Sequence, residues 1–285
     1  MLQKVSLNRA SDAAAADPDL ACHDLCVGYG AQPILKDVSF TAMRGQITAL
    51  VGPNGCGKST LLKTMARILK PDRGRISLFG TDITQLATRK IAQRMALLPQ
   101  GPVAPEGLTV RELVAQGRFP HQTLLRQWTR EDARAVDDAM AVTHVAELAD
   151  RPVMALSGGQ RQRCWIAMVL AQQTDIILLD EPTTFLDLRV QVDIMTLLRD
   201  IARQRNRTLV VVLHELNIAA AFADKIVMMR DGQIVQEGPP DSTVSATALR
   251  AVFDLDAQVI ADPETGRPVC IPRTGRVVDG GLPVA

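Results

Sequence analysis

A glycine-rich loop at residues 52–60 has the residue types and the spacing that bind phosphate. Glycines allow successive backbone N–H groups to turn inward and form a concave nest for phosphate oxygens. Lys58 would neutralise charge on the β- and γ-phosphates of a nucleoside triphosphate, and the hydroxyl of Ser59 would bind Mg²⁺. We expect phosphate contacts from the whole loop, which comprises Gly52, Pro53, Asn54, Gly55, Cys56, Gly57, Lys58, Ser59 and Thr60.

The sequence around this loop argues against a chance match. The glycine, lysine and hydroxyl pattern alone would occur in about one random chain of this length in a hundred. Residues 47–51 form a short apolar run before the loop, and residues 58–69 carry apolar side chains at helical spacing until Pro71. A strand, a glycine-rich turn and a helix are the elements that a phosphate-binding loop requires.

Two acidic residues follow a second apolar run. Residues 176–179 predict a buried strand, and Asp180 and Glu181 come at its carboxyl end, where ligands bind in open α/β sheets. We expect Asp180 to hold Mg²⁺ through water and Glu181 to orient or deprotonate an attacking water molecule. The alternative is a strand that ends in ordinary surface acids.

His214 follows another apolar run, at residues 208–213. A lone histidine in this place is more often structural than catalytic. At the carboxyl end of a strand, however, it lies on the same edge as Lys58 and Asp180. We therefore expect its side chain to hydrogen-bond the γ-phosphate and to help position water and Glu181.

Composition narrows the class of function. The chain has 285 residues, 47% of them hydrophobic, which is enough for a core in one large domain or one domain with a lobe. A net charge of +1 and 3% aromatic residues argue against nucleic acid as a partner. The five cysteines include no C-x-x-C pair, which fits a reducing compartment, and Cys22, His23 and Cys26 fit a strand better than a metal site.

Alternating strand and helix patterns predict a mostly parallel sheet with helices on both faces. Helical patterns also fill much of residues 101–155, which we interpret as an inserted helical lobe. No run is apolar and long enough for a transmembrane helix, and no signal peptide is evident, so a membrane function would need a separate membrane subunit. The segments at the two ends are a flexible tail at residues 1–19 and a C-terminal extension at residues 254–285 with a turn at residues 262–267.

A second glycine motif, at residues 156–160, resembles that of a known family. Residues 156–160 resemble the signature of ABC-type ATPases, and the other family motifs stand around it in the family's order. The signature residues are Leu156, Ser157, Gly158, Gly159 and Gln160. The resemblance covers about residues 20–250 and implies ATP as the substrate. The roles that it implies are adenine stacking for Tyr29, catalysis and a contact to Mg²⁺ or water for Gln100, the D-loop acid for Asp187, the switch histidine for His214 and phosphate contacts for Lys58.

The resemblance also implies a fold. This is the P-loop NTPase fold of ABC ATPases, an α/β fold with a mostly parallel sheet core, an N-terminal antiparallel β subdomain and an inserted α-helical subdomain. The ATPase domain would span residues 20–253, with the helical subdomain at about residues 101–155.

The signature is a second anion-binding element in a chain that already has one. Ser157, Gly158 and Gly159 precede a helix, so they offer a hydroxyl, backbone N–H groups and a helix dipole. This makes sense if they complete the site of another copy, and the resemblance implies a head-to-tail homodimer around two ATP molecules. A plain helix start with Ser157 as N-cap is the simpler interpretation, and both can hold at once.

The family partner is an integral membrane permease, which works with a separate substrate-binding protein. The resemblance makes the chain a peripheral subunit on the cytoplasmic face of the inner membrane. The helical lobe would then receive the permease, and four arginines are candidate contacts, although each fits a solvated helix face equally well. These are Arg111, Arg118, Arg126 and Arg130.

The nucleotide site does not contact the cargo, so only resemblance can suggest it. Residues 156–172, 179–187, 212–217 and 261–272 are most similar to ATPases of iron–siderophore importers. Importers of haem, cobalamin or another metal chelate remain open. Two rival classes are an ABC ATPase without a transport function and a P-loop kinase of small molecules.

Three residues depart from the pattern or add to it. Glu215 and Phe185 stand where many relatives carry Asp and a smaller residue. Cys56 lies beside a helix N-terminus and Lys58, both of which favour a thiolate. We therefore expect Cys56 to be reactive until nucleotide shields it.

Overall fold

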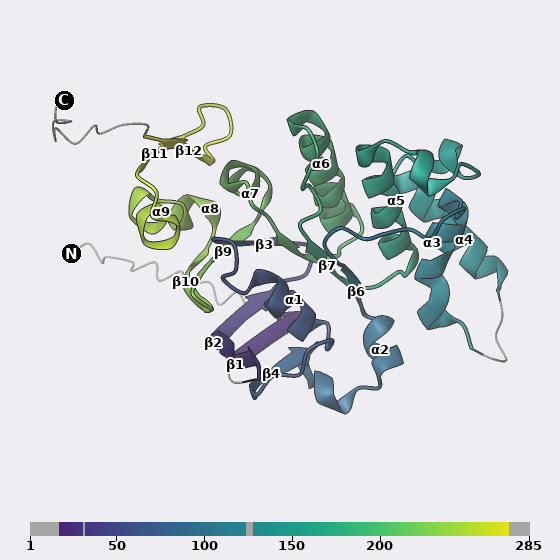
Figure 1. Cartoon of the computed structure of the whole chain (residues 1–285), viewed down its shortest axis with the longest axis horizontal. Coiled ribbons are helices and arrows are strands. Elements are labelled where there is room, and N and C mark those ends of the chain that lie inside the picture. Colours follow the sequence, from purple (N-terminus) through teal and green to yellow (C-terminus); the bar gives the residue numbers. More distant parts are fainter. Residues whose placement is uncertain (1–16, 31, 124–127, 274–285) are drawn as a thin grey trace, which may run out of the picture.

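A six-stranded sheet forms the core of the computed structural model, which describes residues 17–30, 32–123 and 128–273 (Figure 1). Its strand order is β10-β9-β3-β8-β7-β6. All neighbouring strands are parallel except β10 and β9, so the expected mostly parallel core is confirmed. The strands are β3 (Ile47–Val51), β6 (Met95–Leu98), β7 (Ile176–Asp180), β8 (Thr208–Val212), β9 (Lys225–Arg230) and β10 (Gln233–Gly238).

Both faces of this sheet are covered, which explains why its central strands are apolar throughout. Alternate residues of β3 enter different cores: Ala49 belongs to the same apolar cluster as residues of helix α6 (Leu188–Gln204), and Leu50 to the same cluster as residues of helix α1 (Lys58–Met65). The helix expected at residues 58–69 is shorter than predicted. Its C-cap is Ala66, and Arg67 then adopts a left-handed backbone with φ of 58°, which takes the next residues out of the helix.

An antiparallel sheet with the order β2-β1-β4-β5 covers the α1 side and confirms the expected β subdomain (Figure 1). Its strands are β1 (Leu20–Tyr29), β2 (Gln32–Ala42), β4 (Arg73–Leu78) and β5 (Thr81–Asp82). Asp19, which we expected in the flexible tail, is 5% exposed and accepts a hydrogen bond of 2.5 Å from Thr208 Oγ1. It therefore belongs to the folded body, whereas residues 1–16 lie outside the described residues.

Helices fill the segment expected as a helical insertion at about residues 101–155, and they pack with a later helix, α5, into a lobe beside β6 (Figure 1). Its helices are α3 (Val110–Ala115), the 3-10 helix η2 (Gln116–His121), α4 (Arg130–Val142), the 3-10 helices η3 (Ala146–Leu148) and η4 (Val153–Ala155), and α5 (Gly158–Ala171). Thr109 and Thr129 cap α3 and α4 through reciprocal bonds with Glu112 and Asp132, so both helix starts are encoded locally.

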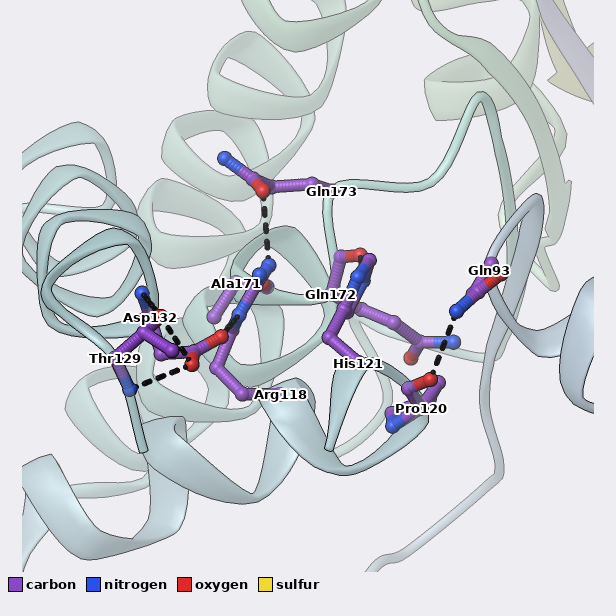
Figure 2. A network of polar contacts seen from close by, with 9 residues as sticks. All are labelled: Gln93, Arg118, Pro120, His121, Thr129, Asp132, Ala171, Gln172 and Gln173. Atoms are coloured by element: carbon purple, nitrogen blue, oxygen red, sulfur yellow. Dashed lines mark hydrogen bonds and ion pairs between the residues drawn. The ribbon is translucent and has the colours of Figure 1, made fainter. Parts of the chain in front are cut away.

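Arg118 is buried at the base of this lobe, with 1% of its surface exposed, so the expectation that it contacts a permease is wrong. Figure 2 shows its guanidinium between three elements. Nε donates to Asp132 Oδ1 at 2.8 Å, and Nη1 donates to the Ala171 carbonyl and to Gln173 Oε1, each at 2.8 Å. The arginine therefore connects η2 to the start of α4 and the end of α5.

The other three arginines have different surroundings. Arg111 is exposed and pairs with Asp137 at 2.7 Å, and Arg130 is exposed at the start of α4. Arg126 lies outside the described residues. A contact between Arg111 or Arg130 and a permease stays a prediction.

A second set of contacts attaches the lobe to the core beside helix α2 (Thr88–Ala92). The Pro120 carbonyl accepts from Arg89 Nε at 2.9 Å and from Gln93 Nε2 at 3.0 Å. His121 Nε2 shares a hydrogen bond of 2.8 Å with the carbonyl of Gln172, the C-cap of α5, and Gln172 Nε2 donates to the Ala92 carbonyl of α2 at 2.5 Å. Figure 2 shows the Gln93 and His121 contacts on the core side of the Arg118 network.

The C-terminal part continues from β10 through α8 (Pro240–Thr243) and α9 (Ala246–Phe253) to a hairpin of β11 (Ala257–Ala261) and β12 (Pro268–Pro272). Asp262 N donates to the Arg267 carbonyl at 2.8 Å, which confirms the turn expected at residues 262–267. Within the described ranges, no helix is long and apolar enough to cross a membrane.

Replacing Arg118 by Met should destabilise the lobe. The change leaves the buried Asp132 carboxylate without its cation, which costs about 3–5 kcal/mol in comparable pairs. Urea unfolding checks this, with Arg111→Met as control because an exposed pair contributes less than about 1 kcal/mol. Equal unfolding midpoints for the two variants would contradict the assignment.

The same pair should make stability depend on pH. Burial opposes ionisation of Asp132, but hydrogen bonds from Thr129 and Arg118 outweigh it, so its pKa is lowered. A lowered native pKa contributes stability above the unfolded value of about 3.9 and loses it as pH falls through the native value. The difference in free energy of unfolding between wild type and Arg118→Met should therefore become smaller below about pH 4, which the same urea experiment measures at several pH values.

Candidate nucleotide site

A pocket of about 410 Å³ lies at the carboxyl edge of the parallel sheet. The sheet brings together there nine residues that the sequence singled out in four separate motifs. The pocket lining comprises Ile34, Asn54, Gly55, Gly57, Lys58, Ser59, Thr60, Gln100, Glu181 and His214. Ile34 was not anticipated, because nothing in its own sequence context marks a binding residue.

The glycines of the phosphate loop are needed for its path. A Cβ at Gly52 would lie 2.2 Å from the Met229 carbonyl oxygen, so the loop can pass strand β9 only without a side chain. Gly57 precedes α1 with φ of 104°, a conformation that favours glycine. No side chain caps α1, so its first N–H groups remain available to an anion.

Lys58 folds back over the loop that it follows. It is 5% exposed, and Nζ donates to the Gly52 carbonyl at 2.8 Å and the Pro53 carbonyl at 2.9 Å. Its third partner is Cys56 Sγ at 3.8 Å, a weak acceptor that a phosphate oxygen would replace. The expected position of this charge in the pocket is therefore observed.

Cys56 corrects the expectation of a thiolate. The residue is 5% exposed, and burial raises the pKa of its thiol even though Lys58 Nζ lies 3.8 Å from Sγ. The argument from the neighbouring charge omitted desolvation, which has the larger effect here. Cys56 is thus a neutral, buried thiol in the described structure.

Asp180 and Ser59 form an oxygen pair beside the phosphate loop. Ser59 Oγ donates to Asp180 Oδ1 at 2.9 Å, and Asp180 is 4% exposed. Burial raises the pKa of Asp180, so a nearby cation would favour its ionised form. One carboxylate and one hydroxyl suit Mg²⁺, which takes its other ligands from water and phosphate.

Glu181 is held in place by three side chains. Gln100 Nε2 and Thr184 Oγ1 donate to its Oε2 at 2.6 and 3.0 Å, and His214 Nε2 lies 2.5 Å from its Oε1. Its backbone is left-handed with φ of 53°, which is costly for a non-glycine residue and clusters at functional sites. Thr184 was not anticipated, although its position three residues after Glu181 is the spacing of a local side-chain contact.

His214 reaches the pocket as expected but contacts Glu181 in this structure. Glu215, the next residue, accepts a hydrogen bond of 2.8 Å from Gln191 Nε2 of α6. The longer carboxylate at this position therefore has a defined partner. Gln191 was missed because its contact joins segments that are far apart in the sequence.

The signature residues begin helix α5 and do not line the phosphate pocket. Ser157 and Gln160 form a reciprocal N-cap, so the simple structural interpretation is correct. A Cβ at Gly159 would lie 2.7 Å from Val190 Cγ1, so this glycine also lets α5 approach α6.

Leu156 is 7% exposed, whereas Ser157 and Gly158 are exposed and available to a partner. Figure 1 shows α5 in the lobe, apart from α1.

For two further residues, Asp187 and Tyr29, the structure does not test the predicted role. Asp187 Oδ1 accepts from Val190 N at 3.0 Å and so caps α6. This local role leaves its D-loop role a prediction. The side chain of Tyr29 lies outside the described residues, so its contact with adenine also stays a prediction.

A second pocket of about 330 Å³, here called the signature hollow, lies between the lobe and the segment after Glu181. Phe185 stands at its wall with its surface 100% exposed and a left-handed φ of 63°. Other lining residues come from the start of α5 and from the segment after Gln100. They include Gly101, Val103, Gly158, Arg161 and Trp165.

Known relatives match almost the whole chain. The petrobactin import ATP-binding protein of Bacillus anthracis is 50% identical over 248 residues, which cover 87% of this chain and 91% of that protein. The iron(3+)-hydroxamate import ATP-binding protein of Bacillus subtilis is 47% identical over 252 residues, 88% and 94% of the two chains. A hemin import ATP-binding protein of Thermobifida fusca is less similar, at 40% identity over 89% and 88%.

Solved structures agree with this assignment. A chain of an inward-facing ABC transporter designated metal-chelate type has a TM-score of 0.80 at 30% identity, covering 91% of this chain and 98% of that one. A dimeric bacterial ABC transporter cassette has a TM-score of 0.68 at 26% identity, covering 77% and 98%. The family model described as ABC transporter matches residues 35–184. The chain therefore belongs to the ABC transporter family and is one of its ATP-binding subunits.

Proposed function

We propose that this chain hydrolyses ATP to energise uptake of an iron(III)–siderophore complex by an ABC importer. The observation that carries the ATPase part is the Glu181 carboxylate, held by Gln100, Thr184 and His214 in the pocket of the phosphate loop. The names of the petrobactin and iron(3+)-hydroxamate relatives support the cargo.

The phosphate loop and the buried oxygen pair bind the substrate. Backbone N–H groups of the loop and the start of α1 hold the phosphates, and Lys58 neutralises part of their charge. Ser59 and Asp180 would hold Mg²⁺, and Gln100 would contact the ion or its water. When bound, this ion neutralises the developing charge of phosphoryl transfer.

Glu181 carries the hydrolytic step. A carboxylate at the edge of the phosphate pocket orients a water molecule and accepts its proton as the oxygen attacks the γ-phosphorus. His214 and Gln100, which engage the Glu181 carboxylate here, exchange partners for the γ-phosphate and the water when ATP enters.

The complete site needs a second copy. Ser157, Gly158 and Gly159 start α5 with an exposed hydroxyl and N–H groups, and they lie outside the phosphate pocket of their own chain. A head-to-tail homodimer places them on the γ-phosphate of the partner's ATP. The dimeric cassette among similar structures supports this arrangement.

The dimer works at the cytoplasmic face of the inner membrane. It docks on integral permease subunits, which receive cargo from a separate substrate-binding protein. The relatives named for iron import are the more similar ones, which favours iron–siderophore cargo over haem.

Replacing Glu181 by Gln should lower ATP hydrolysis by about 10²–10⁴-fold, because the general base is lost. The amide still allows ATP to bind, so the variant should accumulate as a nucleotide-bound dimer. Phosphate release and light scattering measure the two effects. Glu264→Gln, in the exposed hairpin turn, is the control, and a Glu181→Gln protein that stays monomeric with ATP would refute the dimer.

Phe185 is fully exposed in the signature hollow beside the start of α5, so we expect the head-to-tail dimer to bury its ring. Replacing Phe185 by Ala in the Glu181→Gln protein should therefore weaken the ATP-bound dimer. Burial of a phenylalanine contributes about 1.5–3 kcal/mol, so dissociation should become at least about tenfold easier. Sedimentation at several concentrations measures the dissociation constant. Phe119→Ala, which removes another ring that is 79% exposed, should leave the dimer unchanged. Equal constants for the two variants would exclude Phe185 from the interface.

Cells that lack this chain should lose uptake of a labelled iron(III)–siderophore, because the importer loses its energy source. Wild-type chain should restore uptake, and Glu181→Gln should not. If these cells instead lose uptake of labelled haem and keep siderophore uptake, the cargo is haem and the proposal of an iron(III)–siderophore complex is wrong.

A further inference from the structure

The C-terminal hairpin of β11 and β12 is fastened to helix α7 (Leu216–Phe222), which begins two residues after His214. The Asn217 side chain makes two hydrogen bonds to the backbone of Cys270. Its Nδ2 donates to the Cys270 carbonyl at 3.1 Å, and the Cys270 N–H donates to Oδ1 at 2.8 Å. The Asn217 side chain, in the first turn of α7, thus forms the same pair of hydrogen bonds with strand β12 that the backbone of a neighbouring strand would form.

Arg267, at the end of the hairpin turn, fastens the other end of the same helix. Its Nη1 donates to the Ala223 carbonyl at 2.8 Å and to the Ala220 carbonyl at 3.4 Å. These carbonyls lie in the last turn of α7 and at its C-cap, where a cation is also favoured by the helix dipole. The hairpin therefore holds α7 at both ends.

Apolar packing reinforces this attachment close to the nucleotide site. Leu216, the first residue of α7, packs against a small cluster formed by Leu249, Ala257 and Cys270. The cluster also lies close to the core sheet, since its helix α9 packs beside β9 and Arg230 of β9 donates to the Ala251 carbonyl of α9 at 2.7 Å. The hairpin thus gives α7 a support that is tied to the sheet.

Helix α7 depends on such support. It has seven residues, and Glu215 at its N-cap makes no capping hydrogen bond. Isolated helices of this length are marginal in water, so tertiary contacts must set its position. On its other side, the Glu215 carboxylate is held by Gln191 of α6. His214 is thus the middle of the three residues that join strand β8 to a helix whose position is set by tertiary contacts.

We infer that the C-terminal hairpin positions His214 for its contact with Glu181, and that Asn217 and Arg267 are positioning residues for this contact. His214 Nε2 must reach Glu181 Oε1 at 2.5 Å from a backbone that α7 holds. Freeing α7 from the hairpin lets the imidazole depart from this geometry. The consequence for turnover rests on the proposed ATPase function, whereas the position of the imidazole does not.

Nuclear magnetic resonance of the histidine rings tests the position directly. The chain has four histidines, and the signal that disappears in His214→Ala identifies His214. We expect this signal to shift or broaden in Asn217→Ala and Arg267→Ala, while those of the other histidines stay in place. Gln258→Ala is the matched control, because Gln258 is an exposed amide on the same hairpin with no side-chain hydrogen bond among the described residues.

Steady-state ATP hydrolysis tests the consequence. We expect Asn217→Ala to lower kcat by at least about threefold and to leave KM for ATP within about twofold, because the phosphate loop is untouched. In a His214→Ala background the same change should have no further effect, as expected for residues that act through one another. Arg267→Lys, which keeps a cation near the Ala223 carbonyl, should retain more activity than Arg267→Ala.

The outcomes separate the two proposals. An unchanged His214 signal and an unchanged kcat in Asn217→Ala overturn the positioning role. So does a loss of kcat that is equally large in the His214→Ala background, because it would indicate a general structural effect. Absence of ATP hydrolysis in the wild-type protein overturns the proposed function alone, and the His214 signal then still decides the inference. Should Asn217→Ala fail to fold, Arg267→Ala and Arg267→Lys provide the same comparison.

Discussion

The parallel register of β3, β7 and β8 is the constraint on which the site depends. Parallel strands end at the same edge, so whatever follows them in sequence meets there, however far apart the segments are along the chain. The phosphate loop follows β3, Asp180 ends β7 and His214 comes after β8. Both faces of the sheet are buried, and these three strands are accordingly apolar along most of their length.

The same edge places charged groups in surroundings that are partly shielded from water. Lys58 and Asp180 are almost fully buried, and each has a polar partner. In the proposed function, an incoming triphosphate with its metal ion supplies the charges that such groups otherwise lack. The left-handed backbone of Glu181 and its three partners fit this view of a site arranged in advance of its substrate.

Local and distant roles coincide in several residues. Ser157 caps α5, Gly159 allows α5 to approach α6, and Asp187 caps α6. The proposed contacts with the partner copy use the same residues, because a helix start leaves N–H groups that attract anions. A structural role therefore does not argue against the proposed one. The two glycine-rich elements face different surroundings in one chain, which is why the proposed active unit is a pair.

The sequence alone determined the alternation of elements and the parallel core, since periodicity and motif spacing are local properties. Together with the family resemblance, which supplied Gln100, it also identified every pocket residue except Ile34. Tertiary structure decided what depends on burial and on distant contacts. The thiol of Cys56 is neutral because desolvation exceeds the effect of a nearby cation. Arg118 and Asp19 are interior because partners from other segments satisfy them. Gln191 could not be found from the sequence, because its contact with Glu215 exists only after α6 and α7 have packed together.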